Sequence, residues 1–211
     1  MFRKFIDHLV VTAPSLAAGA AFVRAALGVA PSPGGEHARM GTHNLLLRLG
    51  ESTYLEVIAA NPAAPRPARP RWFALDTLAG DARPTLATWV ARSADIRAAA
   101  EVATERLGAI EQMSRGALDW LITVPADGSM PLEGIAPALI EWHTDAHPAS
   151  RLDDHGLSLK KLELHHPEPE RVERLLKSLA IDGPVVVEKS AMTARLVAHI
   201  GTPQGMRILA G

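Results

Sequence analysis

The sequence predicts an α+β protein that is built from repeated β-α-β-β units. The first observation is a faint internal duplication. An apolar strand pattern opens a first unit at 7–11 and closes it at 54–58, and a similar pattern opens a second unit at 88–91 and closes it at 139–142. A third stretch with a related order of elements follows towards the C-terminus. Repeated units of this kind place corresponding strands beside each other in one sheet.

The second observation is a glutamate inside each closing strand. Glu56 follows His8 by 48 positions, and Glu141 follows Trp89 by 52 positions, so the two spacings nearly agree. A carboxylate is costly to bury without a partner, yet each of these interrupts an apolar run. The pattern predicts that the two glutamates contribute to one site shared between the units.

Local signals justify each element of the first unit in chain order. Residues 5–13 form an apolar run rich in β-branched side chains, which predicts a strand. A helix is expected from Ser15, which is a suitable N-terminal cap, to Gly28, which ends it. A loop is expected at 31–35, and strands are expected at 40–49 and 53–59. Whether an extra strand forms near His37 is not decided by the sequence.

Two connectors separate the three units. Residues 61–71 contain four prolines and predict an extended, semi-rigid connector, and residues 147–156 predict a second one. The second unit is expected to begin again with a strand at 86–91, followed by one helix and three strands at 95–107, 110–115, 118–124 and 138–142. The C-terminal βαββ unit is expected to have a strand, a helix and then short strands, at 159–164, 167–179, 185–187, 194–200 and 206–209.

Composition excludes several classes of function. The formal net charge of −1 offers no overall field for nucleic acid or an anionic membrane. The absence of cysteine excludes disulfides, thiolate metal sites and a cysteine nucleophile, and it is consistent with a reducing compartment. No signal peptide and no apolar run of roughly 20 residues occurs, so we expect a cytoplasmic protein without a membrane or nucleic-acid partner.

His8, Glu56 and Glu141 are the candidate metal ligands. One imidazole and two carboxylates suit a divalent first-row metal, and three protein ligands leave positions open for substrate. Each residue also has a purely structural interpretation. His8 could be a core histidine bonded to backbone, and either glutamate could point from an edge strand to solvent.

Five other residues are candidates for substrate binding. His43 and Asn44 lie at the start of a strand and could bind a polar group, although a simple turn is an equal alternative. Trp89 occupies the place that corresponds to His8 and would give the pocket a flat apolar wall, unless it is plain core. Arg115 and Trp142 are weaker candidates for the pocket rim. No phosphate-binding glycine loop or serine-hydrolase elbow occurs.

The stretches 7–10, 41–44, 54–58 and 139–142 together resemble the vicinal oxygen chelate superfamily, and within it the glyoxalase-like domain family. The resemblance covers residues 5–148. It implies tandem βαβββ modules that form one cupped mixed sheet of the glyoxalase/bleomycin resistance-like kind. It also implies a divalent metal in the cup, such as Zn, Ni, Mn or Fe, which chelates two neighbouring oxygens of a small-molecule substrate.

By position, the resemblance implies that His8 and Glu56 are first-module metal ligands and that Glu141 is the second-module carboxylate, which can also act as a catalytic base. Trp89 stands where a histidine or glutamine-type ligand is usual, so the sequence departs from glyoxalase I. We therefore expect a glyoxalase-like domain over 1–150, made of modules 1–62 and 83–148.

An additional C-terminal module over 151–211 is expected either to cap the sheet or to make the contact of a homodimer. The expected function is a metal-dependent isomerase, lyase or dioxygenase that acts on a small molecule with adjacent oxygens. The alternative is a metal-free protein of the same fold that binds or sequesters a small apolar molecule against its tryptophans.

Overall fold

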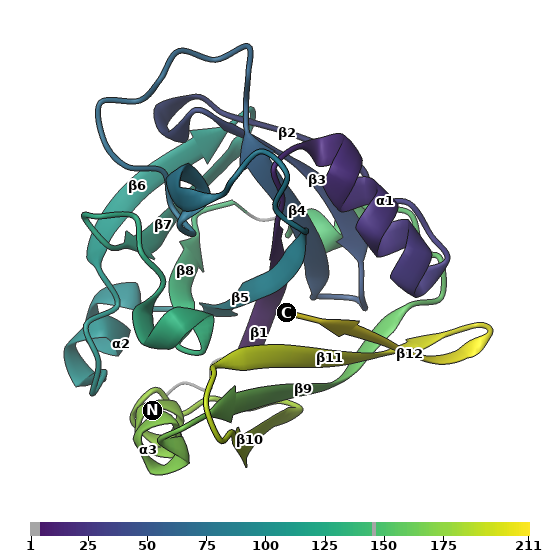
Figure 1. Ribbon diagram of the computed structural model, residues 1–211. Helices are drawn as coiled ribbons and strands as arrows, with labels where there is room; N and C mark the ends of the chain where they lie inside the picture. Colours follow the sequence, from purple (N-terminus) through teal and green to yellow (C-terminus); the bar gives the residue numbers. More distant parts are fainter. Residues whose placement is uncertain (1–4, 145–146) are drawn as a thin grey trace.

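A computed structural model describes residues 5–144 and 147–211 of the chain (Figure 1). The first module begins with strand β1 (Phe5–Thr12) and helix α1 (Leu16–Leu27). Three strands follow in order: β2 (Ser32–His37), β3 (Thr42–Arg48) and β4 (Tyr54–Ala60). A short 3-10 helix, Ala38–Met40, joins β2 to β3. The module is therefore βαβββ, and its extra strand lies over the segment that the sequence indicated as a loop.

The second module repeats this order. It consists of β5 (Thr85–Arg92), α2 (Ile96–Val102), β6 (Ala109–Arg115), β7 (Leu118–Val124) and β8 (Ala138–Trp142). The two modules form one eight-stranded mixed sheet in the order β2-β3-β4-β1-β5-β8-β7-β6. Within each module the first and last strands pair in parallel, and β1 and β5 join the modules as an antiparallel pair. The predicted fold class is confirmed.

The helices of the two modules begin where the sequence supplies a cap. The Ser15 side chain accepts a hydrogen bond from the Ala18 amide at the start of α1, and Gly28 ends that helix in the left-handed conformation, with φ at 78°. Asp95 caps α2 in the same way by accepting from the Ala98 amide. Both helices lie on the convex side of the curved sheet (Figure 1).

The third unit covers the rest of the convex side. It contains β9 (Ser158–His166), α3 (Pro169–Ser178), β10 (Val185–Lys189), β11 (Arg195–Thr202) and β12 (Gly205–Ala210), which form a second sheet in the order β10-β9-β11-β12. Its inward leucines, such as Leu162 and Leu196, share one apolar core with Leu9, Trp89 and Leu139 of the large sheet. The third unit therefore packs against the convex face of the large sheet.

The concave side of the large sheet forms a cup, because the sheet curves until its edge strands β2 and β6 lie against each other. Charged side chains bridge this seam. Arg39 donates to the Gln112 carbonyl at 2.8 Å and pairs with Glu111, and Arg69 binds the same Glu111 carboxylate at 2.9 Å. The seam makes the cup nearly a closed barrel.

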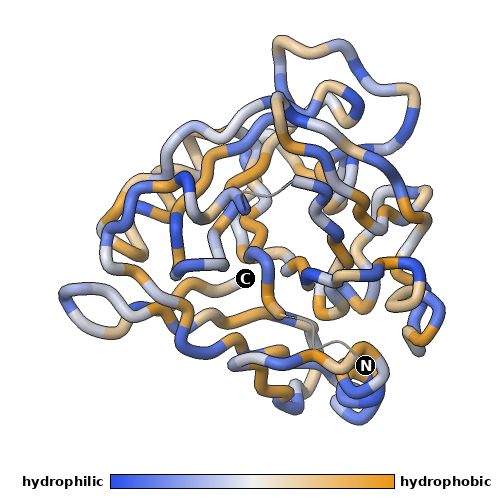
Figure 2. Tube along the Cα trace, turned by 180° about the vertical axis from the view of Figure 1, so that it is seen from behind, coloured by the Kyte–Doolittle hydropathy of each residue, from blue (hydrophilic) through white to orange (hydrophobic). Residues whose placement is uncertain are grey.

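The segment between the modules lies across the open end of the cup. Its proline-rich part projects from the molecule as a mostly hydrophilic loop (Figure 2), but Trp72 and Phe73 turn inward and are buried. The Ala74 amide donates to the Gly128 carbonyl at 2.8 Å, and Arg71 pairs with Asp76 at 2.6 Å. These contacts fix the segment as part of the cup wall. No helix in the described ranges is long and apolar enough to cross a membrane.

Candidate functional site

His8 and Glu56 come together at the bottom of the cup. Side chains alternate between the two faces of a strand. On β1, His8 faces the cup, while its neighbour Leu9 lies in the core on the convex side. On the adjacent strand β4, Glu56 faces the cup in the same way, and the His8 Nε2 atom lies 3.6 Å from the Glu56 Oε2 atom. Both side chains are less than a tenth exposed.

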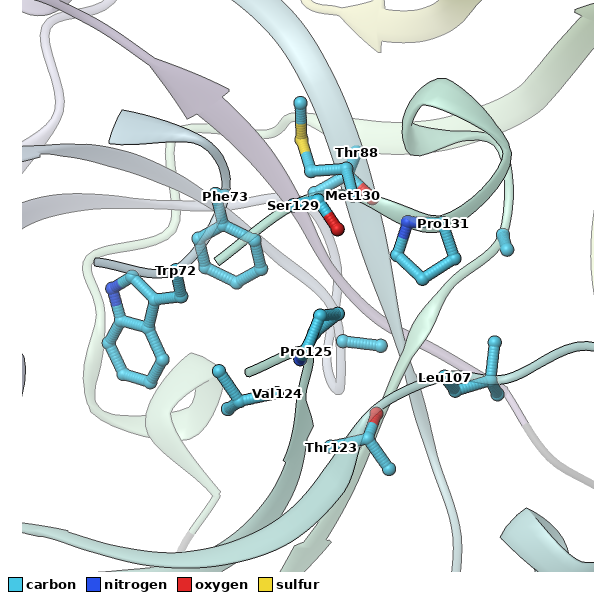
Figure 3. Close-up of a pocket in the computed structure, with 12 residues that line it drawn as sticks. Trp72, Phe73, Thr88, Leu107, Thr123, Val124, Pro125, Ser129, Met130 and Pro131 are labelled. Atoms are coloured by element: carbon cyan, nitrogen blue, oxygen red, sulfur yellow. The ribbon is translucent and has the colours of Figure 1, made fainter. Parts of the chain in front are cut away.

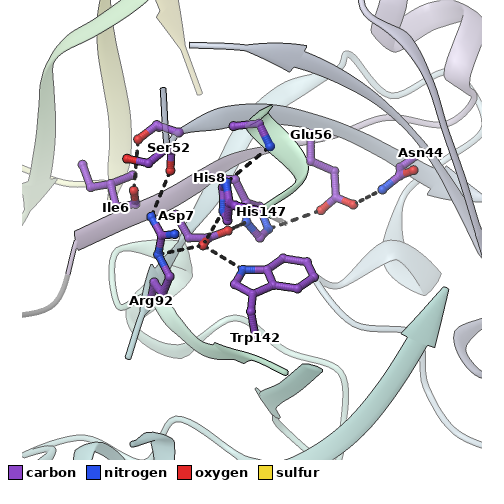
Figure 4. Close-up of polar contacts among 11 residues, drawn as sticks. Ile6, Asp7, His8, Asn44, Ser52, Glu56, Arg92, Trp142 and His147 are labelled. Carbon is purple, nitrogen blue, oxygen red and sulfur yellow. Dashed lines mark hydrogen bonds and ion pairs between the residues drawn. The ribbon is translucent and has the colours of Figure 1, made fainter. Parts of the chain in front are cut away.

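Asp7 fixes the orientation of His8 (Figure 4). The register of β1 against β5 shifts between Ile6 and His8, and at this irregularity the Asp7 Oδ1 atom lies 2.7 Å from the His8 Nδ1 atom. Trp142 Nε1 and His147 Nε2 each lie 2.9 Å from the other oxygen, Oδ2. The buried Asp7 carboxylate therefore contacts three other side chains of the site.

The ionisation of Asp7 follows from these partners. Burial raises the pKa of Asp7, but the hydrogen bonds with His147 and His8 and the attraction of their charges outweigh it and hold this pKa well below its usual range. An ionised carboxylate can only accept hydrogen bonds. The His8 Nδ1 atom therefore carries a hydrogen, and when the ring is neutral its Nε2 atom presents a lone pair towards Glu56.

Asn44 positions Glu56 from the neighbouring strand β3. The Asn44 Nδ2 atom donates to the Glu56 Oε1 atom at 2.5 Å, while the Asn44 Oδ1 atom is buried without a partner in the described chain. A Cβ atom on Gly34 would lie 2.2 Å from this Oδ1, so a glycine is required there. The adjacent His43 points outward into a surface hollow. Of this predicted pair, the structure brings Asn44 to the site and not His43.

His37, Tyr54 and Arg115 also lie in the cup. The sequence analysis did not identify His37 or Tyr54 as site residues, and it placed Arg115 only at the rim. His37 is buried, its Nδ1 lies 3.1 Å from Thr42 Oγ1, and its Nε2 lies 3.4 Å from the Arg115 Nη1 atom. Burial lowers the pKa of His37 to about 4, so it is neutral near pH 7 and its Nε2 accepts from Arg115. Tyr54 stacks on His8 with ring centroids 4.5 Å apart. Burial raises its pKa well above 10, so its phenol stays protonated.

These side chains line a cavity with an empty volume of about 320 Å³, which includes space open to solvent. Its polar lining consists of His8, Glu56, His37, Tyr54 and Arg115. The rest of the lining is aromatic and aliphatic, with Trp72, Phe73, Trp120, Ile122, Ile140 and Trp142. Trp142 and Arg115, predicted as rim residues, both line this cavity.

Trp89 lies on the other face of the sheet. It is fully buried in the core between the two sheets, and its Nε1 atom donates to the Ile135 carbonyl at 2.8 Å. The residue that pairs with His8 across the β1–β5 junction is Val90. Trp89 is therefore a core residue, which was the alternative interpretation of this position. The tryptophans that line the cavity are Trp72, Trp120 and Trp142.

Glu141 also lies outside the cup. Its Oε2 atom accepts a hydrogen bond at 2.7 Å from the Ile96 amide at the start of α2, and its Oε1 atom lies 3.0 Å from His143 Nε2. The neighbours Ile140 and Trp142 are the residues of β8 that line the cavity. This corrects the expectation that Glu141 joins His8 and Glu56. The carboxylate instead stabilises the positive end of a helix.

The donors in the cup do not fit a metal held by three protein ligands. The His8 Nε2 and Glu56 Oε2 atoms are near enough to share an ion, but the described residues contain no group of three histidine, aspartate or glutamate side chains that could hold one. Catalytic metal sites usually have three protein ligands. The second module contributes Val90, Ile140 and Trp142 where ligands would be needed, and Arg115 adds a positive charge to the same cavity.

One solved structure supports the fold, and two others are more distantly similar. A hypothetical protein from Staphylococcus aureus matches with a TM-score of 0.61 and 14% identity over 99% of this chain and 85% of that chain, so the likeness includes the third unit. A methylmalonyl-CoA epimerase from Streptomyces coelicolor, in complex with 2-nitronate-propionyl-CoA, gives a TM-score of 0.42 and 16% identity over 68% of this chain and 100% of its own. The corresponding epimerase from Mycobacterium tuberculosis gives 0.42 and 14% over 65% and 85%.

Comparison of the sequence identifies the family. A search of curated proteins finds no match to this chain. The family model described as a glyoxalase-like domain matches residues 6–180, which include both modules of the large sheet and reach into the third unit. This chain therefore belongs to the glyoxalase-like domain family.

Proposed function

We propose that this protein is an enzyme that moves a proton on a small anionic molecule bound in the cup. The observation that carries the proposal is the position of Glu56. Its carboxylate is buried in the wall of the cup cavity, oriented on one oxygen by Asn44 and close to His8 on the other. Buried, oriented carboxylates in such cavities are typical of general bases.

Arg115 supplies the charge that would hold an anion. Its guanidinium contacts His37, which is neutral, and it has no carboxylate partner in the described part of the chain. The same side chain lines an open surface hollow, where its Cδ atom lies 2.8 Å from the position of a Cβ on Gly35. Arg115 thus connects solvent with the cup, and an anionic oxygen can pair with it from either side.

The chemistry that this arrangement supports is reversible proton abstraction next to a carbonyl group. Glu56 Oε2 takes the proton as the C–H bond breaks, and the electron pair moves onto the carbonyl oxygen. His8 Nε2 can receive the proton from Glu56, and the ionised Asp7 stabilises the imidazolium that results. Return of a proton to the same carbon completes an isomerisation or an exchange, so no oxidant or second reactant is required.

The proposal can be tested without knowing the natural substrate. A panel of 2-oxo acids is incubated with the protein in D2O, and loss of the proton signal next to the carbonyl is followed by NMR. We expect exchange well above the uncatalysed rate for at least one acid, in buffer containing a chelator. Binding of these acids without any exchange would contradict an enzyme and favour a binding protein, a role for which the aromatic wall of the cavity is suited.

Replacement of Arg115 is expected to weaken anion binding. The Arg115→Gln variant should bind the same acids about tenfold to a hundredfold more weakly, because a hydrogen bond to a charged group is lost in a buried site. Quenching of tryptophan fluorescence measures this, since three tryptophans line the cavity. Arg39→Gln is the matched control, because Arg39 lies on the seam and not in the cavity. Equal affinity of Arg115→Gln and wild type would contradict the role of Arg115.

Metal binding is expected to be weak. After incubation with Zn, Ni, Mn or Fe and removal of free ions, elemental analysis should find far less than one ion per chain, because His8 and Glu56 are two donors where three are usual. The alternative of a metal-dependent enzyme predicts the opposite result. It would be supported by one ion per chain that is lost in both His8→Ala and Glu56→Ala but retained in Glu141→Ala.

A further inference from the structure

We infer that the ligand of this protein has an apolar arm, such as an aryl or branched alkyl group, which lies in a second compartment of the cup. The inference rests on the proposed function for the anionic head of the ligand and adds the class of molecule. It is carried by a neighbouring cavity, by the hydrogen bonding of that cavity's walls, and by the segment that separates the two compartments.

The second compartment continues the cup along strand β7. It has an empty volume of about 330 Å³, a figure that includes space open to solvent, and it shares Trp72 and Phe73 with the first cavity (Figure 3). Trp120 and Ile122 of β7 line the first cavity, and Thr123 and Val124 farther along the same strand line the second. The two compartments therefore follow one another along β7, and an elongated molecule that passes Trp72 and Phe73 would occupy both.

The described walls of the second compartment are mostly apolar, and the indole nitrogen of Trp72 is the exception. The apolar lining includes Leu107, Val124, Pro131 and Ala138. Each of its three hydroxyl groups makes a hydrogen bond within the protein. Thr88 Oγ1 donates to the Gly134 carbonyl at 2.9 Å, Thr123 Oγ1 accepts from the Leu139 amide at 2.9 Å, and Ser129 Oγ donates to Asp127 at 2.7 Å. An apolar group fits such walls, whereas a polar group would lose its hydration without replacement.

Trp72 marks the boundary between the compartments and has an unused donor. Its Nε1 atom is buried without a hydrogen-bond partner among the described residues, and the side chain is 4% exposed. Figure 3 shows this nitrogen on the side of the ring turned away from Phe73. Buried tryptophan N–H groups usually have an acceptor. A ligand oxygen between the head and the arm would supply it.

The partition between the compartments is a strained turn. Phe73 and Ala74 have φ values of 56° and 53°, in the left-handed region that non-glycine residues rarely adopt. Contacts of the Ala74 amide with Gly128 and of Arg71 with Asp76 hold the turn in place. The packing of Trp72 and Phe73 in the apolar cluster of the cup also holds the turn, so an arm that passes it has to displace this part of the wall.

The test compares two acids with the same head. Pyruvate has no arm, and phenylpyruvate carries an aryl arm, so both are titrated by calorimetry and by tryptophan fluorescence. Wild type should bind phenylpyruvate at least about tenfold more tightly than pyruvate, because the ring leaves water. The Ala138→Leu variant fills the second compartment and should remove this preference while leaving the affinity for pyruvate unchanged. Ala138→Ser, which adds little volume, is the matched control.

Two results would overturn the inference. One is equal affinity of wild type for both acids, or binding of neither. The other is an equal loss of affinity for both acids in Ala138→Leu, when thermal denaturation shows that the variant is folded. Binding needs no turnover, so these results are independent of the proton-exchange experiment. Proton exchange without tighter binding of phenylpyruvate would support only the proposed function. Tighter binding of phenylpyruvate without proton exchange would support only the apolar arm.

Discussion

Replacing Asp7 by asparagine is expected to lower the free energy of unfolding by about 3 kcal/mol, since removing one partner from a buried charged network leaves the others unpaired. Asp7 is fully buried and takes contacts from His8, Trp142 and His147, with Arg92 at 3.4 Å. The amide keeps the shape of the carboxylate but cannot hold several donors around a negative charge. Urea denaturation followed by tryptophan fluorescence measures the loss. The control is Asp119→Asn, which changes a half-exposed carboxylate on β7.

The same variant is expected to change the response to acid. The pKa of Asp7 is depressed in the folded protein, so its contribution is fully present above the ordinary aspartate pKa of about 4. It is lost progressively as the pH falls below that value towards the folded pKa. Wild type should therefore lose its stability advantage over Asp7→Asn between about pH 4 and the acid limit. An advantage that is constant from pH 7 down to acid unfolding would show that Asp7 is not ionised.

Replacing Glu56 by glutamine is expected to slow proton exchange by at least about a hundredfold, which is the usual contribution of a positioned general base. The amide has nearly the same size, can still contact Asn44, and cannot take a proton. Binding of the acid should change far less than the exchange rate, because Arg115 and the aromatic wall remain. Exchange by NMR and binding by fluorescence, measured on the same sample, separate the two effects.

A matched control for this variant is Glu36→Gln, since Glu36 lies on β2 near the mouth of the cup but is exposed. It removes the same charge without touching the site. Exchange in Glu56→Gln at the wild-type rate would exclude Glu56 as the base. A loss of exchange in both variants would instead indicate that overall charge near the opening is responsible.

The repeated pattern of strands and helices predicted the elements, and the resemblance to the glyoxalase-like family implied the cupped sheet that they form. Period-two apolar runs and the caps at Ser15 and Gly28 mark the elements, and the two similar units imply one shared sheet. The prediction that His8 and Glu56 approach each other came from their places in the first and last strands of one module. Parallel pairing of those two strands brings them together.

The residues that the second module contributes to the site could not be predicted from the repeated pattern. A period of two leaves open which of two neighbouring residues faces the cup, and a shift of one position reverses every side chain. Trp89 and Glu141 differ by one position from Val90 and Ile140, which face the cup. Contacts with α2 and with the third unit determine which set points outward, and no local pattern records those contacts.

The remaining site residues depend on tertiary contacts. His37 and Arg115 belong to opposite edges of the sheet and meet because the sheet closes. Gly34 and Gly35 suggested a turn, whereas in the structure they lie on a strand and leave space for Asn44 and Arg115. A signal for Asp7 was present, since an aspartate directly before a buried histidine suggests a partner for its ring.

Closure of the seam also determines how copies of this protein can associate through their backbones. Edge strands with unpaired amides and carbonyls are templates for pairing with another chain. In the large sheet the two edges, β2 and β6, face each other and are bridged by Arg39, Arg69 and Glu111. The remaining edge strands are β10 and β12 of the small sheet, and β12 exposes Met206 and Ile208.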